Sequence, residues 1–164
     1  MRRPRPERAG PGQESVWDYP RPPRVEASGQ RVVVRFGGEL LADTTRSVRV
    51  LETSHPPVHY LPVSDIDPAA LHPSARTTFC EFKGVARYVT VALGRRELDA
   101  GWTYPQPTAG FEVLRDHVAL YPSRMDSVEL GGELVLPQEG DFYGGWVTSR
   151  VVGPFKGSPG TWGW

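Results

Sequence analysis

Residues 32–40 have the sequence VVVRFGGEL, which predicts an antiparallel β-hairpin. Val32, Val34 and Phe36 are two residues apart, so in an extended chain they lie on one face and can form part of a core. Gly37-Gly38 then supplies the positive φ angles that a two-residue hairpin turn needs. Glu39–Ala42 provides the returning strand. This stretch indicates a fold built from antiparallel strands and tight turns.

The rest of the chain repeats this pattern of short apolar strands between turns. The whole chain contains 18 glycines and 17 prolines. This composition favours many turns and argues against a helical bundle or a parallel sheet with crossover helices. Helix is expected only as single turns, one capped by Asp67 and ending at Leu71, and one following Thr108 with Phe111 and Leu114 buried. The further expected strands are Ser47–Thr53, Val58–Leu61, Val85–Leu93, Val118–Tyr121, Val128–Leu130 and Glu133–Leu136, with a second GGEL tetrapeptide at 131–134.

Length and composition limit the domain organisation and exclude several functions. The 164 residues predict a single domain over residues 14–164, preceded by an Arg- and Pro-rich tail, residues 1–13, that is predicted to be disordered. The 19 basic and 19 acidic residues balance, which argues against a nucleic-acid partner. No apolar run approaches the roughly 20 residues of a membrane span. Because residues 1–13 also lack the apolar core of a signal peptide, a cytoplasmic location is expected.

Two similar segments carry aromatic residues on a stiff backbone. Trp17 and Tyr19 precede Pro20-Arg-Pro22, and Trp102 and Tyr104 precede Pro105-Gln-Pro107. Prolines hold such segments extended, so the two rings could form the wall of a binding cleft. A segment that is already stiff would lose little conformational entropy when a ligand binds. The alternative is that each strip covers a sheet edge or packs on the core.

The densest polar run is residues 52–60, with the sequence ETSHPPVHY. Glu52, Ser54, His55 and Tyr60 are candidates for lining a cleft. His55 and His59 cannot form a helical metal-binding pair because Pro56-Pro57 separates them, and in an extended chain they would be roughly 13 Å apart. No metal site is therefore predicted, and the single cysteine, Cys80, excludes a disulfide framework and favours packing over reactivity.

Residues 141–146, DFYGGW, are the most site-like stretch of the chain. The two glycines would let the backbone approach a ligand closely, while Tyr143 and Trp146 offer flat surfaces with one polar group each. Asp141 is a candidate anchor for a hydroxyl or an amine. The alternative is a glycine-rich hairpin whose tryptophan belongs to the core.

The chain holds only two lysines against 17 arginines, and both lie in the tripeptide Phe-Lys-Gly. A GC-rich genome would explain the excess of arginine. Lys83 and Lys156 are nevertheless candidate ligand contacts, because a lysine is a compact cation that differs chemically from arginine. The alternative is that both are solvated surface charges.

Six segments carry motifs that follow one another along the chain. They are ESVWDYPRPPRVE (14–26), VRVLETSHPPVHYLP (48–62), FKG with the following strand (82–93), WTYPQP (102–107), HVALYP (117–122) and DFYGGWVTS…VVGPFKGSPGT (141–161). Together they resemble the domain of unknown function 427 family of bacteria. The resemblance implies a mainly β, β-tent fold, in which two antiparallel sheets pack at a steep angle, with one or two short helices. Related modules with this architecture contain zinc and hold a small imide in a tryptophan cage, but one cysteine cannot supply their four zinc thiolates.

The leading functional prediction is a binding module for a small molecule, with an aromatic-lined cleft between the two sheets and no cofactor. A second hypothesis is an enzyme that uses His55 as general base, with Lys83 or Lys156 stabilising an anion. A third is a protein-interaction scaffold. The sequence leaves the identity of the ligand and the oligomeric state open.

Overall fold

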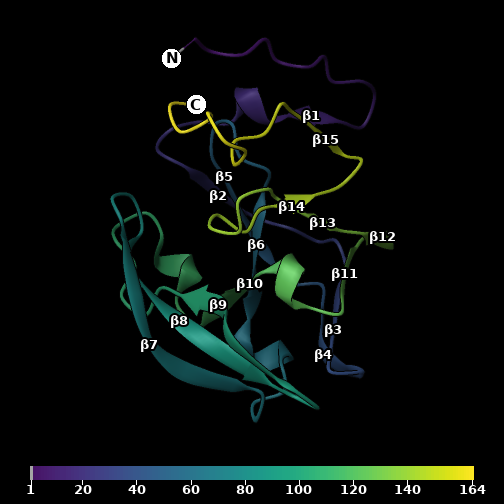
Figure 1. Ribbon diagram of the computed structural model, residues 1–164, viewed down its shortest axis with the longest axis vertical. Helices are drawn as coiled ribbons and strands as arrows, with labels where there is room; N and C mark the ends of the chain where they lie inside the picture. The colour runs from purple at the N-terminus through teal and green to yellow at the C-terminus, as the bar shows by residue number, and fades with distance from the viewer. Residues whose placement is uncertain (1) are drawn as a thin grey trace.

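The computed structural model describes residues 2–164 and is built almost entirely from β-strands (Figure 1). The helical segments within these residues are four single 3-10 turns, η1 (Val16–Asp18), η2 (Val63–Asp65), η3 (Glu112–Leu114) and η4 (Pro122–Arg124). The strands are β1 (Glu14–Ser15), β2 (Arg24–Ala27), β3 (Val32–Phe36), β4 (Glu39–Thr44), β5 (Val48–Leu51), β6 (Val58–Pro62), β7 (Leu71–Cys80), β8 (Gly84–Ala92), β9 (Arg96–Thr103), β10 (His117–Leu120), β11 (Ser127–Leu130), β12 (Glu133–Leu134), β13 (Leu136–Pro137), β14 (Trp146–Val147) and β15 (Val151–Val152).

Two antiparallel sheets form the body of the protein. The larger has seven strands in the order β2-β5-β6-β10-β9-β8-β7, and the smaller has four in the order β12-β11-β3-β4. Two further pairs complete the fold, of which β13–β14 is antiparallel and β1–β15 is parallel. The β1–β15 pair lies beside both chain ends at the top of Figure 1. The prediction of a mainly β fold with two antiparallel sheets is confirmed.

The hairpin at residues 32–40 forms as predicted. Val32, Val34 and Phe36 on β3 are fully buried, and Gly37 and Gly38 turn the chain with φ of 60° and 77°. The second GGEL makes the same turn between β11 and β12, with φ of 58° and 82° at its two glycines. Because β3 and β11 are neighbours, the two hairpins lie on either side of the centre of the small sheet.

The two faces of the seven-stranded sheet bury different kinds of side chain. One face packs against the four-stranded sheet and forms an aliphatic core, which includes Leu61, Val89, Val91, Val118 and Leu120 from the larger sheet. The opposite face carries an aromatic cluster. Its main rings are Tyr60, Tyr88, Trp102, Tyr104 and Tyr121, of which Tyr60 and Tyr88 alternate with the core residues Leu61 and Val89 along β6 and β8.

Several local predictions were wrong. The expected helical turn after Asp67 is a plain turn that leads directly into β7, although the Asp67 carboxylate does accept the Ala69 N–H at 3.0 Å. Strands β7 and β9 were missed because Pro73 and Gly101 interrupt their apolar pattern. Val85 is in phase with the buried Val89 and Val91 on the predicted strand, but it is 47% exposed and pairs with the exposed Phe79 on the edge strand β7.

Residues 2–13 precede β1 without a strand or helix, and their predicted disorder stays a prediction. In the structure the Glu7 N–H donates to the Gly153 carbonyl at 2.8 Å. Among the described residues, no helix has the length and apolar character needed to cross a membrane.

Candidate functional site

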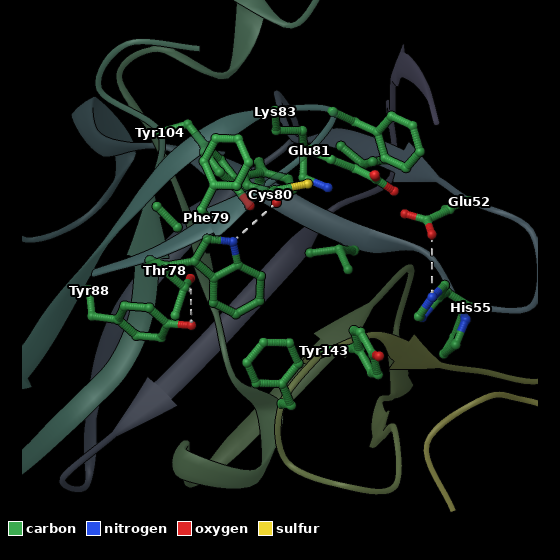
Figure 2. A pocket seen from close by; sticks show the side chains of 18 residues that line it. Glu52, His55, Thr78, Phe79, Cys80, Glu81, Lys83, Tyr88, Tyr104 and Tyr143 are labelled. Atoms are coloured by element: carbon green, nitrogen blue, oxygen red, sulfur yellow. Dashed lines mark hydrogen bonds and ion pairs between the residues drawn. The ribbon is translucent and has the colours of Figure 1, made fainter. Parts of the chain in front are cut away.

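A cavity of about 250 Å³ lies on the aromatic face of the seven-stranded sheet (Figure 2). Tyr60, Tyr88, Trp102 and Tyr104 line it from strands β6, β8 and β9 and the end of β9. The turn at residues 78–83 forms another part of the wall, and Glu52, His55, Phe142 and Tyr143 complete it. The cleft was predicted between the two sheets, but the space between them is filled by the aliphatic core, and the cavity lies on the other side of the larger sheet.

Strand register explains how the central rings come together. Ala119 on β10 pairs with Tyr60 on one side and with Trp102 on the other, so a small side chain separates two large ones. The Trp102 indole N–H donates to the Tyr60 hydroxyl at 3.1 Å, and the two rings meet edge to face. This arrangement fixes both rings at the inner wall of the cavity.

The phenol groups of Tyr60 and Tyr104 are held neutral. Desolvation by burial raises the pKa of Tyr60 and of Tyr104 above their usual value. The Tyr88 hydroxyl lies 3.3 Å from the Thr78 hydroxyl, a contact that Figure 2 marks. Neutral phenols both donate and accept hydrogen bonds, so the wall offers polar contacts without charge.

The loop at residues 138–145 closes the cavity from the side opposite the sheet. The Trp146 N–H donates to the Pro57 carbonyl at 2.8 Å, and the Tyr121 hydroxyl donates to the Phe142 carbonyl at 3.0 Å. Gly144 has φ of 70°, and a Cβ built on it would lie 2.7 Å from Cη2 of Trp102. The two glycines of DFYGGW therefore let the backbone approach the protein's own residues, Gly144 at Trp102 and Gly145 at Pro56 and Gln138, where the sequence suggested a ligand.

His55 is fixed by Gln138 in a single hydrogen-bonding arrangement. The Gln138 side-chain oxygen accepts the Gly145 N–H at 3.0 Å, and its nitrogen donates to the Lys156 carbonyl at 2.7 Å. That nitrogen is also 3.2 Å from Nδ1 of His55. Because the amide orientation is set by its other two partners, Nδ1 accepts this hydrogen bond and the ring proton lies on Nε2.

The His55 ring is neutral at physiological pH. Burial, together with the positive charges of Lys156, Arg21 and Lys83, lowers its pKa to about 3. Its Nε2 lies 3.5 Å from the carboxylate of Glu52, which also accepts a hydrogen bond from Nε of Arg21 at 3.1 Å. Since Nδ1 is occupied and Nε2 carries a proton, His55 can donate a hydrogen bond but has no free lone pair with which to act as a base.

Lys83 lines the cavity from the turn between β7 and β8. The Lys83 carbonyl accepts the Thr108 N–H at 3.1 Å, and the Thr108 hydroxyl donates to the Phe82 carbonyl, so the loop after β9 holds this turn in place. The side chain is only 9% exposed, and its ammonium lies 5.8 Å from the centre of the Tyr104 ring. Glu81, two residues before Lys83, forms no ion pair with it.

Lys156 lies on the far side of Tyr143. Its ammonium is 5.3 Å from the centre of the Tyr143 ring, and it lines a second cavity of about 370 Å³ together with Trp162. Phe142 and Tyr143 line both cavities, so these two rings form the partition between them. The Lys156 N–H donates to the Ser54 carbonyl at 2.9 Å, which places this lysine beside the His55 segment.

A family model described as Domain of unknown function (DUF427) matches residues 24–131. The chain belongs to this family. No curated protein matches it. The DUF427 match contains the cavity residues from Glu52 to Tyr104, whereas Tyr143 and Lys156 lie beyond it.

Within this DUF427 chain, the cavity brings together seven of the thirteen residues proposed from sequence. They are Glu52, His55, Tyr60, Lys83, Trp102, Tyr104 and Tyr143. Ser54 lies just behind the wall, fully buried, and its hydroxyl accepts a hydrogen bond from Arg21 at 3.3 Å. Asp141 is exposed on the covering loop and does not reach the cavity.

Three of the proposed aromatic residues lie elsewhere in the DUF427 fold. Trp146 is 1% exposed and belongs to the aliphatic core, where it stacks on His59 with ring centres 4.8 Å apart. Trp17 and Tyr19 join the chain ends: the Trp17 indole donates to the Pro154 carbonyl at 2.9 Å and packs edge-on against Trp164. The alternation of side chains along a segment shows which residues share a side, but it does not indicate which part of the protein that side packs against.

Sequence reasoning missed several residues of the DUF427 cavity. Cys80 was expected to be a packing residue, and it does contact the aromatic cluster, but it is half-buried and lines the cavity. Gln138 was missed because only the folded loop brings it to His55. Tyr88 could have been found, since it lies in phase with Ala86 on a strand that was predicted.

Within residues 2–164, no three His, Cys, Asp or Glu side chains lie close enough together to hold an ion.

Proposed function

We propose that this DUF427 protein binds a small molecule in the aromatic cavity and does not transform it. The observation that carries the proposal is the cavity of about 250 Å³, whose walls combine aromatic rings with a few fixed polar groups. This combination is typical of small-molecule sites. A concave site also favours a small ligand over a protein partner, which would require an exposed apolar patch.

The state of His55 favours binding over catalysis. A general base near neutral pH needs a free nitrogen lone pair and a pKa close to the working pH. His55 has its Nδ1 engaged by Gln138 and a pKa lowered to about 3. Its Nε2–H would orient a ligand by donating a hydrogen bond, so His55 is proposed as a binding residue.

The single cysteine offers a direct test of the cavity. Cys80 is the chain's only cysteine and it lines the cavity, so alkylation by iodoacetamide reports on this site alone. Native mass spectrometry of protein purified from its host, together with a library of small aromatic compounds, would supply candidate ligands. A bound ligand should slow alkylation of Cys80 by about tenfold at roughly ten times its Kd.

A matched pair of variants ties this protection to the cavity wall. Tyr143→Ala removes a half-buried ring from the covering loop and should abolish protection while leaving unfolding within about 1 kcal/mol of wild type. Leu98→Ala is the control, since Leu98 is 62% exposed and does not line the cavity. Ligands that bind without protecting Cys80, or that bind Tyr143→Ala unchanged, would contradict the proposal.

A further inference from the structure

The two lysines of this chain differ from its arginines in what they contact. Seven arginines form ion pairs with carboxylates, among them Arg21 with Glu52 and Arg49 with Glu14 and Glu26. Within residues 2–164, neither Lys83 nor Lys156 has a carboxylate within 4 Å of its ammonium. Both lysines lie beside aromatic rings and line cavities instead.

Lys83 is the more unusual of the two because it is nearly buried. A charge removed from water is costly unless an opposite charge or hydrogen bonds compensate it. The face of Tyr104 attracts the ammonium, but a cation–π contact compensates only part of that loss. In the described chain, every fully buried side-chain nitrogen or oxygen has a hydrogen-bond partner. The Lys83 ammonium has none among these residues, so it is not fully buried and keeps its access to solvent. That access lies where Lys83 lines the cavity.

The acidic residues of the cavity do not compensate this charge. Glu52 is already paired with Arg21 and lies close to His55 (Figure 2). Glu81 is exposed at the rim and forms no ion pair with Lys83. Lys83 and Lys156, neither of which forms an ion pair in the part of the chain that the structure describes, add positive charge near His55 on this side of the cavity.

We infer that the ligand of this cavity is an anion, with a carboxylate or phosphate group that pairs with the Lys83 ammonium and an apolar body that packs on Trp102 and Tyr104. This inference rests on the proposed function and adds the chemical class of the ligand. Lys156, behind Tyr143, strengthens the attraction without touching the ligand. The neutral phenols and the His55 Nε2–H supply donors for the anion's remaining oxygens.

Matched pairs of charged and neutral probes test the inference. The probes are 2-naphthoate against 2-naphthamide, and 2-naphthyl phosphate against 2-naphthol, so each pair keeps the ring and changes the charge. Affinity is measured by calorimetry, with Cys80 alkylation locating the site. The anion of a pair should bind about tenfold or more tightly than its neutral partner. The two pairs together distinguish a carboxylate site from a phosphate site.

Lys83→Met keeps an unbranched side chain, one atom shorter than lysine, and removes its charge. It should abolish the preference for the anion while the neutral probes bind as before. Arg96→Met is the control, because Arg96 is an exposed cation on β9 outside the cavity. If Lys83→Met fails to fold, Lys156→Met serves as the second variant and should weaken the anion's preference in part.

Each outcome separates this inference from the proposed function. Equal affinity for charged and neutral probes, with Cys80 protected, would overturn the anion inference and leave a binding cavity. A preference for anions that survives in Lys83→Met would also overturn it. Failure of all four probes to bind would overturn it as well, whereas the proposed function fails only if no compound, including any from the host, protects Cys80.

Discussion

The two faces of the seven-stranded sheet are built from the same strands but end in different environments. On β6, Leu61 enters the aliphatic core while Tyr60 enters the aromatic cluster. On β10, Val118 and Leu120 point to the core and Ala119 lies between Tyr60 and Trp102. One face is covered by a second sheet, whereas the other is covered by the loop at 138–145 and the residues around η3.

This difference explains why the cavity lies where it does. Two sheets with aliphatic side chains interdigitate closely, so the space between them fills completely. On the aromatic face, the hydrogen bond between Trp102 and Tyr60 fixes two large rings, and only a loop covers them. Small neighbouring side chains such as Ala86 do not fill the space that remains, so a cavity is left there. The aliphatic face thus provides stability, and the aromatic face provides the candidate site.

The sharpest way to break the comparison is to truncate a large ring in the aliphatic core and, as a control, an equally large ring at the surface. Trp146→Ala removes a 1%-exposed ring from the aliphatic core and should lower the free energy of unfolding by about 3–5 kcal/mol. Trp162→Ala, a change of the same size at a 76%-exposed position, should change it by less than about 0.5 kcal/mol. Chemical denaturation measures both. A mild effect of Trp146→Ala would mean that this face is not the stabilising one.

Acid should destabilise the protein through one histidine on each face. Burial lowers the pKa of His55 and of His59 to about 3, against 6.5 for an exposed histidine. The unfolded chain therefore binds more protons between these values, so stability is full above pH 6.5 and is lost as the pH falls towards 3. Each histidine should cost about 2 kcal/mol of stability at pH 5 relative to pH 7.5.

Thermal unfolding of His55→Gln and His59→Gln across this pH range separates the two contributions. Each variant should lose about half of the wild-type pH dependence between pH 5 and 7.5. The inference from burial would be wrong if both variants kept the full slope. A ligand that contacts His55 should alter the pH dependence of stability in His59→Gln, where His55 remains. It should leave the pH dependence of His55→Gln unchanged.

The smallest expected effect concerns the loop that covers the aromatic face. Gly144→Ala places a methyl group 2.7 Å from Trp102 at a φ of 70°, so it combines backbone strain with a collision. Gly132→Ala has the same kind of strain, with φ of 82°, but its Cβ meets nothing within 4 Å. Gly144→Ala should therefore be about 1–2 kcal/mol less stable than Gly132→Ala. Urea unfolding measures both free energies. Equal losses of stability in the two variants would show that the loop moves away from Trp102 to make room for the methyl group.

Much of the fold could be predicted because its signals are local. The burial of Val32, Val34 and Phe36 and the two GGEL turns follow from residues next to one another in the chain. Strands β7 and β9 escaped prediction because Pro73 and Gly101 are acceptable there only in their tertiary setting. At Gly101, for example, a Cβ would lie 2.5 Å from the Ala119 carbonyl oxygen.

The candidate site was only partly predictable. The polar run at 52–60 and the Trp102–Tyr104 segment both contribute residues to the wall of the cavity. Trp17 and Trp146 carried the same kind of signal, yet one packs at the chain ends and the other in the core. The sequence could not rank these alternatives because each requires partners more than 50 residues away, such as Pro154 for Trp17.

By itself the sequence determined the local alternation of side chains, since the period of two is a property of any extended strand. It also determined the turns, because Gly37-Gly38 and Gly131-Gly132 allow backbone angles that other residues resist. The tertiary structure alone decided which face is closed and which is hollow. That choice depends on long-range contacts, above all the anchoring of the 138–145 loop to Pro57 and Tyr121, which bring Tyr143, His55 and Lys83 around one space.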